Sequence, residues 1–273
     1  NLFNIVFNGE IYNHLILRKE LEEQKKNIFW KGHSDTETIL SCLEHWGVSK
    51  TLQKLQGMFA LGIWDTKNKQ LFLSRDIIGE KPLYFGWGKN VFFFASELKA
   101  LKEHDFFINS INKKAIKSLV EYSYIKTPHS IYSNIYKLFP GTFLKADMNI
   151  VKNIPDNDPH INVEYKNFKI SSYWSLKKEI NNRNILPNDR SKIISSFKEK
   201  FRNTVSSQLI SDTNVGAFLS GGIDSSLVVS FMKEVSTKPF DTFTIGFKEK
   251  DFSEDLKAKE LTSHLGIKNN QLF

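Results

Sequence analysis

The chain has 273 residues, of which 40% are hydrophobic and 25% are charged, and its formal net charge is +8. This composition is typical of globular proteins, and its 23 Phe, 8 Tyr and 5 Trp favour packed sheets over a disordered or coiled-coil chain. A single cysteine, Cys42, excludes an internal disulfide, and no apolar run reaches the roughly 18 residues that a membrane helix needs. We therefore expect a cytoplasmic protein with no membrane partner.

The basic residues are spread along the chain in short pairs, such as Lys113 and Lys114, with acidic residues between many of them. Proteins that bind nucleic acid or anionic membranes cluster their Lys and Arg residues on one surface. The sequence therefore predicts a solvated basic surface rather than a binding patch for nucleic acid.

The first half of the chain is rich in short strands separated by turn residues. In chain order the expected elements are a strand at 2–7, helices near 14–26 and 35–46, and strands at 58–64, 70–74, 82–87 and 91–96. This spacing of short strands and turns predicts stacked antiparallel sheets.

The second half follows a different pattern. From residue 149 to about residue 190 the sequence is polar and its apolar periodicity lapses, which predicts a linker region. Apolar residues then recur at four-residue steps over 191–209, as in a helix. A strand at 215–219, a helix at 224–235 and a strand at 241–247 complete the expected elements, in an order typical of a parallel βαβ unit.

A glycine-containing string, Ser-Gly-Gly-Ile-Asp-Ser-Ser at 220–226, lies between a predicted strand and a predicted helix. Gly221 and Gly222 permit positive φ and close backbone approach, so this turn can present N–H groups to an anion. The start of the helix adds partial positive charge, and the serine hydroxyls can donate to phosphate oxygens. A carboxylate beside phosphates needs a cation, so we expect Asp224 to hold Mg²⁺ that bridges to pyrophosphate.

The string differs from two common nucleotide-binding motifs, because it lacks the Gly-Lys-Ser/Thr of the P-loop and the spacing of the dinucleotide fingerprint. A simple turn with Asp224 or Ser225 as a helix cap is common at such junctions and would account for a bare Ser-Gly-Gly. The complete string after a buried strand resembles the loop of the ATP pyrophosphatase group, which cuts ATP between its α and β phosphates. The resemblance implies an ATP and pyrophosphate site, with Ile245 next to adenine, made by Phe218, Leu219, Ser220, Gly221, Gly222, Asp224, Ser225, Ser226 and Ile245.

Two segments of the first half carry polar groups suited to an amino acid. Asn-Gly-Glu at 8–10 follows the predicted first strand and offers an amide donor, a backbone N–H and an acid. Ser34 and Asp35 lie at the expected start of the second helix. From the residues alone, an Asn-Gly turn followed by a helix explains the first segment equally well.

Six motifs in fixed order extend this observation. They are Asn-Gly-Glu-Ile-Tyr-Asn (8–13), Ser-Asp-Thr-Glu (34–37), Gly-Met-Phe-Ala (57–60), Ser-Arg-Asp (74–76), Gly-Glu-Lys-Pro-Leu-Tyr (79–84) and Ala-Ser-Glu-Leu-Lys-Ala-Leu (95–101). In this order they resemble the class II glutamine amidotransferase domains of glutamine-hydrolysing asparagine synthetases. The resemblance implies that Asn8 and Gly9 form an oxyanion hole, and that Asn8, Gly9, Glu10 and Asp35 bind glutamine. We expect Arg75, Asp76, Lys81 and Glu97 to act as scaffold or at a domain interface.

The resemblance also implies a fold. Over 1–174 it implies an α+β fold of stacked antiparallel sheets, like that of N-terminal-nucleophile hydrolases but incomplete. After a linker over 175–190, it implies the first part of an α/β parallel-sheet ATP-pyrophosphatase domain over 191–273. The family's nucleophile is an N-terminal cysteine that these residues do not include, so we expect the fragment itself to be inactive. Cys42 lies in an apolar helical stretch and is expected to be a core residue.

For the intact protein, the resemblance implies that asparagine, glutamate, AMP and pyrophosphate are made from aspartate, glutamine and ATP with Mg²⁺. One alternative is another acceptor, such as a sugar acid or a peptide carboxylate. Alternatives of other classes are a tRNA-modifying adenylating enzyme and a non-catalytic nucleotide-binding relic. The resemblance suggests a homodimer, and no nucleic-acid partner is expected.

Overall fold

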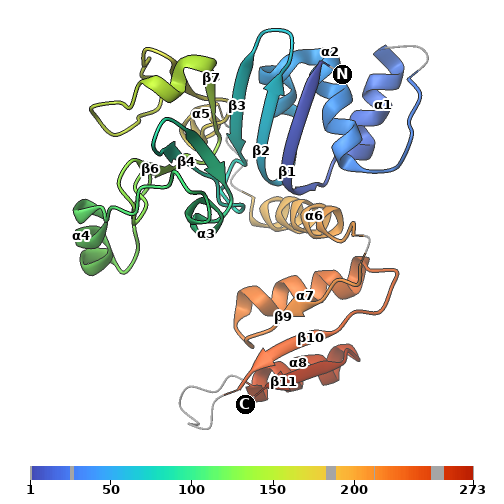
Figure 1. Ribbon diagram of the computed structural model, residues 1–273. Helices are drawn as coiled ribbons and strands as arrows, with labels where there is room; N and C mark the ends of the chain where they lie inside the picture. The colour runs from blue at the N-terminus through green and yellow to red at the C-terminus, as the bar shows by residue number, and fades with distance from the viewer. Residues whose placement is uncertain (1, 25–27, 183–188, 212, 247–254, 273) are drawn as a thin grey trace. The chain divides into compact units, whose positions relative to one another are not determined.

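The computed structural model describes residues 2–24, 28–182, 189–211, 213–246 and 255–272. The chain forms two compact units, residues 1–183 and residues 184–273. Figure 1 labels many of the helices and strands of each. No helix of the described residues is long and apolar enough to cross a membrane.

The first unit is a mixed α/β fold with antiparallel sheets. Its elements are β1 (Phe3–Ile11), α1 (His14–Gln24), α2 (Asp35–Lys54), β2 (Gly57–Asp65), β3 (Gln70–Arg75), β4 (Tyr84–Trp87), β5 (Phe92–Ala95), α3 (Leu98–Lys102), α4 (Lys113–Tyr122), β6 (Ile135–Lys137), β7 (Thr142–Asp147), the 3-10 helix η1 (Met148–Lys152), β8 (Phe168–Ser172) and α5 (Leu176–Asn181). One antiparallel sheet has the order β1-β2-β3-β7-β8 and the other has the order β5-β4-β6. The antiparallel sheets expected from the sequence are confirmed.

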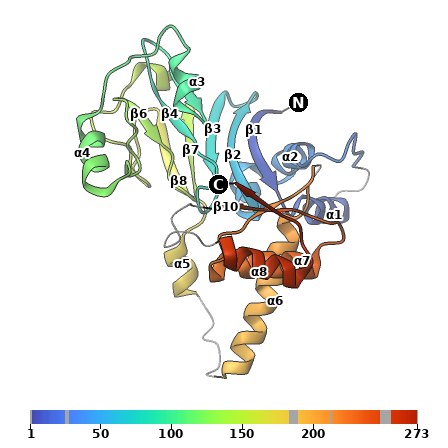
Figure 2. The same cartoon turned by 90° about the horizontal axis from the view of Figure 1, so that it is seen from below.

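The five-stranded sheet is covered on both faces. Helices α1 and α2 pack on one face, where Leu21 and Ile39 join Phe59 and Ile63 in one core. Strands β4 and β6 lie on the other side, as Figure 2 shows, and a second core fills the space between the two sheets. Residues 59–63 of β2 are buried without interruption because both faces of this strand are covered.

Three sequence-based expectations need correction in this unit. The first strand continues through Asn8 and Gly9 to Ile11, so the alternative of an Asn-Gly turn is wrong. Helix α2 does not end near residue 46 but resumes after a kink at Gly47, whose φ is 74°. The polar stretch from residue 149 is not simply a linker, because Phe168–Ser172 forms β8 at the edge of the large sheet and buries Phe168 and Ile170.

The second unit has a parallel sheet. Its elements are α6 (Arg190–Gln208), β9 (Ala217–Phe218), α7 (Ile223–Val235), β10 (Thr242–Ile245), α8 (Asp255–Leu265) and β11 (Asn269–Leu272). Strand β10 pairs in parallel with both β9 and β11, which confirms the expected βαβ unit, although β9 is only two residues long. Residue 247, at the end of the last expected strand, lies outside the described residues.

The two faces of this parallel sheet differ. Leu219 and Thr244 point toward the core that contains Val229 of α7 and Ala258 of α8. Side chains that alternate with them, including Phe218 and Ile245, are exposed on the opposite face.

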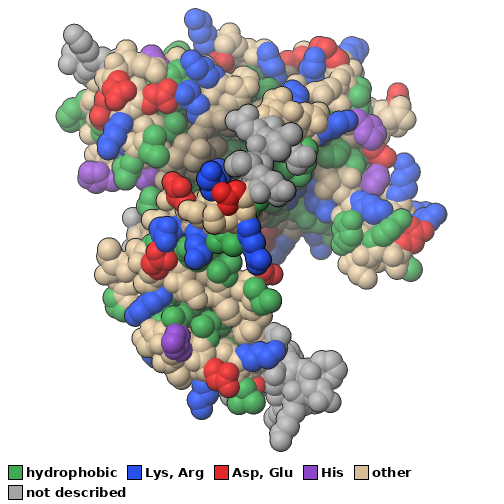
Figure 3. Space-filling view, turned by 180° about the vertical axis from the view of Figure 1, so that it is seen from behind, with side chains coloured by type: hydrophobic (Ala, Val, Ile, Leu, Met, Phe, Trp, Pro, Cys, Tyr) green, Lys and Arg blue, Asp and Glu red, His purple; other side chains and the backbone are tan. Residues whose placement is uncertain are grey.

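Basic side chains do not gather into one patch on the visible surface. On the face drawn in Figure 3, Lys and Arg side chains alternate with acidic ones over both units. This distribution agrees with the solvated basic surface expected from the sequence.

Candidate functional site

The edge of β1 presents backbone donors that the sheet does not use. The bonds from Tyr12 N–H to the Gln56 carbonyl and from Thr66 N–H to the Leu2 carbonyl show that even-numbered residues of β1 exchange ladder bonds with β2. In an antiparallel ladder the N–H and C=O groups of the intervening, odd-numbered residues point to the opposite side of the strand. The N–H of Gly9 therefore points away from β2. Because β1 is the edge strand of its sheet, this N–H faces the open side of the strand.

Only glycine fits at this position of β1. A Cβ on Gly9 would overlap the carbonyl oxygen of Met58 and would lie 2.7 Å from Phe59 Cα. Both are backbone atoms of a buried strand that cannot move aside cheaply. The glycine is therefore required by the close approach of β2, and it keeps the outward N–H of residue 9 in place.

The amide of Asn8 lies next to this N–H and is held by the other sheet. Asn8 is exposed, and its Nδ2 donates a hydrogen bond of 2.9 Å to Ser96 Oγ. Ser96 directly follows β5. An amide nitrogen carries two N–H groups, so one remains for a ligand.

Two carboxylates flank these donors. Glu10 is exposed on the same face of β1 as Asn8. Asp35, the first residue of α2, accepts a bond of 3.0 Å from the N–H of Ile11 at the open edge. The structure thus brings Asn8, Gly9, Glu10 and Asp35 together along the last half of β1.

The end of β1 lies in a negative potential. Burial raises the pKa of the Tyr12 phenol, and the carboxylates of Glu80, Glu10 and Asp76 raise this pKa further. Burial and Asp76 also raise the pKa of Glu80. Negative charge at one end of a row of N–H donors suits a ligand with both an ammonium and a polarised carbonyl.

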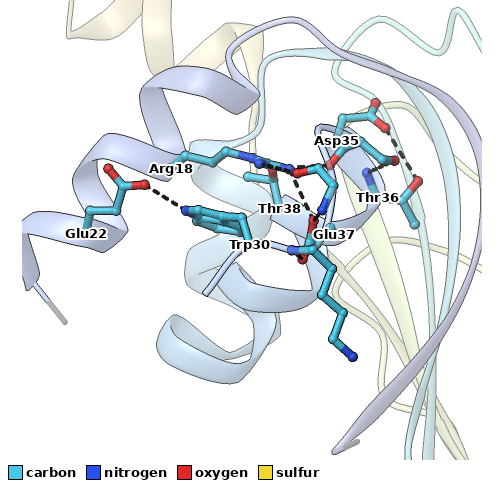
Figure 4. Close-up of polar contacts among 10 residues, drawn as sticks. Arg18, Glu22, Trp30, Asp35, Thr36, Glu37 and Thr38 are labelled. Carbon is cyan, nitrogen blue, oxygen red and sulfur yellow. Dashed lines mark hydrogen bonds and ion pairs between the residues drawn. The ribbon is translucent and has the colours of Figure 1, made fainter. Parts of the chain in front are cut away.

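Helix α2 begins where it does because of a buried arginine, which Figure 4 shows extending from α1 toward the loop before α2. The Arg18 side chain donates 2.8 Å bonds to Thr38 Oγ1 and to the carbonyls of Gly32 and Ser34. Its guanidinium also lies over the Trp30 ring, 4.2 Å from the ring centre. These contacts hold the loop that ends at Asp35.

The same loop is fixed by two local carboxylate and hydroxyl contacts. Ser34 caps α2 by accepting a bond of 3.1 Å from Thr36 N–H. The Glu37 carboxylate accepts the N–H groups of Lys31 and Gly32, and the Lys31 bond is the main cause that lowers the pKa of Glu37. Glu37 is therefore charged at neutral pH and attracts Arg18, 3.6 Å away.

Sequence reasoning missed Arg18 and Ser96. Arg18 lies one residue after Leu17 and three before Leu21, and both leucines are buried. A basic residue among the apolar positions of a helix indicates a buried charge that has polar partners. Ser96 belongs to one of the six motifs, but nothing local in the sequence indicates Asn8 as its partner.

The loop after β3 is held by two of the residues expected to act as scaffold. The side chain of Arg75 donates to the carbonyls of Gly79, Lys81 and Leu138. The fully buried Asp76 carboxylate accepts backbone N–H groups of Phe59, Ile78, Gly79, Glu80 and Lys81. The scaffold role of Arg75 and Asp76 is confirmed.

Cys42 is a core residue, as expected. It is completely buried, and burial raises the pKa of its thiol to about 12. We predict that a thiol reagent leaves Cys42 unmodified at pH 8 in the folded chain and reacts once denaturant is added, because both access and the thiolate form are lacking. The extent of modification is measured with an aromatic disulfide reagent, which releases a coloured thiolate when it reacts with a cysteine. Rapid modification of the native chain would contradict the prediction.

The glycine-containing loop at 220–226 connects β9 to α7. Gly221 has φ of 83°, and Gly222 is the N-cap of α7. The Ser220 N–H donates to Ser225 Oγ at 3.2 Å, and the Gly222 N–H donates to Ser220 Oγ at 3.3 Å. Ser220 and Asp224 of this loop are exposed, and serine hydroxyls accept these two backbone N–H groups.

The other residues expected at the ATP site are placed differently. Phe218 and Ile245 are exposed on the open face of the parallel sheet, and Asp224 is exposed in the first turn of α7. Leu219, in contrast, is only 1% exposed, and its N–H already bonds to the Phe243 carbonyl. We therefore treat Leu219 as a core residue with no free donor for a nucleotide.

The protein side chains beside the loop would suit a magnesium ion only if phosphates supplied most of its ligands. Within the described residues, no group of three or more His, Cys, Asp or Glu side chains could hold a metal. Asp224 offers one exposed carboxylate beside the loop. Mg²⁺ in nucleotide sites commonly takes one or two carboxylates together with phosphate oxygens and water.

Comparison with known proteins agrees with the six motifs and the loop. Residues 1–155 match the family model of the glutamine amidotransferase domain, and residues 196–273 match the asparagine synthase model. Asparagine synthetase [glutamine-hydrolyzing] 1 of Bacillus subtilis is 34% identical over 97% of this chain and 38% of its own length. A putative asparagine synthetase [glutamine-hydrolyzing] 2 of Methanocaldococcus jannaschii is 36% identical over 90% of this chain and 43% of its own length.

The chain thus spans about two fifths of the length of these relatives. Among solved structures, the glutamine phosphoribosylpyrophosphate amidotransferase of B. subtilis matches 99% of this chain and 70% of its own, with 13% identity and a TM-score of 0.43. The resemblance inferred from the motifs is confirmed. Because the first family model covers more than half of the sequence, this chain belongs to the glutamine amidotransferase domain family, and its second unit carries a match to asparagine synthase.

Proposed function

We propose that this chain carries the glutamine site and the phosphate loop of a glutamine-dependent asparagine synthetase. The observation that carries the proposal is the edge of β1, where the outward N–H of Gly9 and the amide of Asn8 lie beside the carboxylates of Glu10 and Asp35. Membership of the amidotransferase family supplies the substrate class, and the relatives' names supply the product.

At the first site, Glu10 and Asp35 bind the α-ammonium of glutamine. Asn8 Nδ2 and the Gly9 N–H donate to the side-chain carbonyl oxygen when a nucleophile attacks its carbon and charge develops on that oxygen. Preorganised donors of this kind favour the transition state because they need no rearrangement when the charge appears. The nucleophile is a cysteine other than Cys42, whose buried thiol has a pKa of about 12.

At the second site, the loop at 220–226 receives the pyrophosphate of ATP. Its serine hydroxyls turn from each other to the phosphate oxygens, and the start of α7 contributes partial positive charge. Asp224 would hold Mg²⁺, which neutralises phosphate charge when bound. The exposed side chains of Phe218 and Ile245 offer an apolar surface next to the loop for adenine.

The finer structural assignments belong to the same proposal. They are an N-terminal-nucleophile type of fold over 1–174, a linker over 175–190 and the first part of an ATP-pyrophosphatase domain over 191–273. The outward donors of β1 and the parallel βαβ unit support them. A cytoplasmic homodimer follows from the family resemblance.

The test uses the protein expressed from the full gene that encodes this chain. With aspartate and Mg-ATP, we expect asparagine, AMP and pyrophosphate in equal amounts when either glutamine or ammonium is the nitrogen donor. Amide formation on a sugar acid or a peptide but not on aspartate would favour the alternative acceptor. Nucleotide binding without any amide product would favour a non-catalytic relic.

A variant separates the two sites. Asp224→Asn is expected to lower asparagine formation from both nitrogen donors at least tenfold, since removal of a metal-bridging carboxylate weakens the ATP complex, while glutamine hydrolysis continues. The matched control is Asp105→Asn, an exposed aspartate of the first unit, which should change neither reaction. Equal loss of glutamine hydrolysis in Asp224→Asn would contradict the assignment of the loop to the ATP half-reaction.

A further inference from the structure

The side chain of Asn8 needs a partner to work as an oxyanion donor. It lies exposed on an edge strand, and the terminal torsion of an asparagine is broad, so its amide can turn with little cost. If the amide turned by half a revolution, its oxygen would face the developing negative charge and repel it. A hydrogen-bond partner that limits this rotation is therefore part of the site's chemistry.

The structure provides such a group 88 residues away. Asn8 Nδ2 donates to Ser96 Oγ at 2.9 Å, so the hydroxyl oxygen accepts and the carbonyl end of the amide is turned away from Ser96. This contact uses one of the two N–H groups of Nδ2. The second N–H is left for a ligand, on the strand that also carries the outward N–H of Gly9.

Ser96 is itself held on both sides. Ala95, before it, is the last residue of β5 and pairs with Tyr84 of β4. Glu97, after it, is the N-cap of α3. Ser96 therefore has little freedom to follow a movement of Asn8, and it acts as a fixed reference for the amide.

The two sheets meet closely enough to keep this contact. A Cβ on Gly62 of β2 would lie 2.7 Å from the ring of Phe94 in β5, so β5 lies directly against the large sheet. The next strand of that sheet is β1. The contact between Ser96 and Asn8 is thus set by the packing of the two sheets and not by a flexible loop.

We propose that Ser96 is a positioning residue for glutamine hydrolysis, which restrains the Asn8 amide through the bond from Nδ2 to Oγ and leaves the second N–H of Nδ2 for the substrate. This inference rests on the proposed function of the β1 edge. Ser96 acts through Asn8 and does not touch the substrate. Its loss leaves glutamine binding intact, because the ammonium contacts of Glu10 and Asp35 do not depend on it.

The test measures glutamine hydrolysis and ammonia-dependent asparagine formation with the product of the full gene. Ser96→Ala is expected to lower kcat for glutamine hydrolysis about tenfold, the effect of one lost hydrogen bond, with KM for glutamine and the ammonia-dependent rate unchanged. Ser96→Thr keeps the hydroxyl and is expected to retain most of the activity. A higher KM, an equal loss of the ammonia-dependent rate, or failure of threonine to rescue would overturn the proposal.

A double variant distinguishes positioning from an independent effect. In an Asn8→Ala background, Ser96→Ala is expected to cause no further loss, since the group on which it acts is gone. Multiplicative losses in the double variant would overturn the proposal. The two proposals fail in different ways. If Asn8→Ala abolishes glutamine hydrolysis but Ser96→Ala does not lower it, this inference fails and the proposed function stands. If the unmodified protein does not hydrolyse glutamine, the proposed function itself fails.

Discussion

Replacing Asn8 with alanine is expected to lower glutamine-dependent turnover by about 10²–10³-fold, the usual cost of one oxyanion donor. The reason is that Asn8 Nδ2 is one of two donors at the open edge of β1, the other being the Gly9 N–H. Ammonia-dependent asparagine formation should be unchanged, because it does not use this site. Both rates are measured with the same preparation of the full gene product.

The strand itself offers a matched control. Asn4 lies four residues earlier in β1, on the same exposed face as Asn8, and it pairs with Trp64 of β2. Asn4→Ala removes the same amide from the same strand and should leave both reactions within twofold of the unmodified protein. Equal losses in the Asn4 and Asn8 variants would show that the effect comes from the strand and not from the oxyanion donor.

Local signals predicted the two candidate sites better than they predicted their supports. The loop at 220–226 is a short string whose glycines predict its geometry, and Gly221 adopts the expected positive φ while Gly222 is the N-cap of α7. The segment at 8–10 was identified through its motif. One of the two alternatives for its conformation, an Asn-Gly turn, was wrong. An Asn-Gly pair usually signals a turn. Here Gly9 lies in a strand and is required by the backbone of β2, about 50 residues away.

The supports are non-local. Ser96 reaches Asn8 only through the packing of two sheets, and Arg18 binds backbone carbonyls, which carry no side-chain signature in the sequence. Strand β8 was not predicted because it has only five residues and polar residues surround it. The burial of its alternate residues depends on pairing with β7, which the local sequence does not show. The candidate ligand-binding residues thus lie in local sequence motifs, whereas the contacts that hold them in place arise only from the fold.

Asp76 is expected to be the most sensitive supporting residue of the first unit. Its carboxylate is fully buried and accepts five backbone N–H groups, which come from β2 and from the loop at 78–81. Hydrogen bonds to a charged group contribute more than neutral ones, and its removal leaves several of these donors without an acceptor. Asp76→Ala is therefore expected to lower the free energy of unfolding by about 3–5 kcal/mol, a large fraction of typical domain stability.

Thermal and urea denaturation of the 273-residue chain measure this loss. Asp76→Asn keeps one acceptor oxygen and should show an intermediate decrease, whereas Asp105→Ala, at an exposed position, should stay within about 0.5 kcal/mol of the unmodified chain. The phenol of Tyr12 supplies a second readout, because the Asp76 carboxylate contributes to the raised pKa of Tyr12 and its removal should lower that pKa. An unchanged midpoint in Asp76→Ala would mean that water replaces the carboxylate at no cost, and that the loop beside β1 does not depend on this charge.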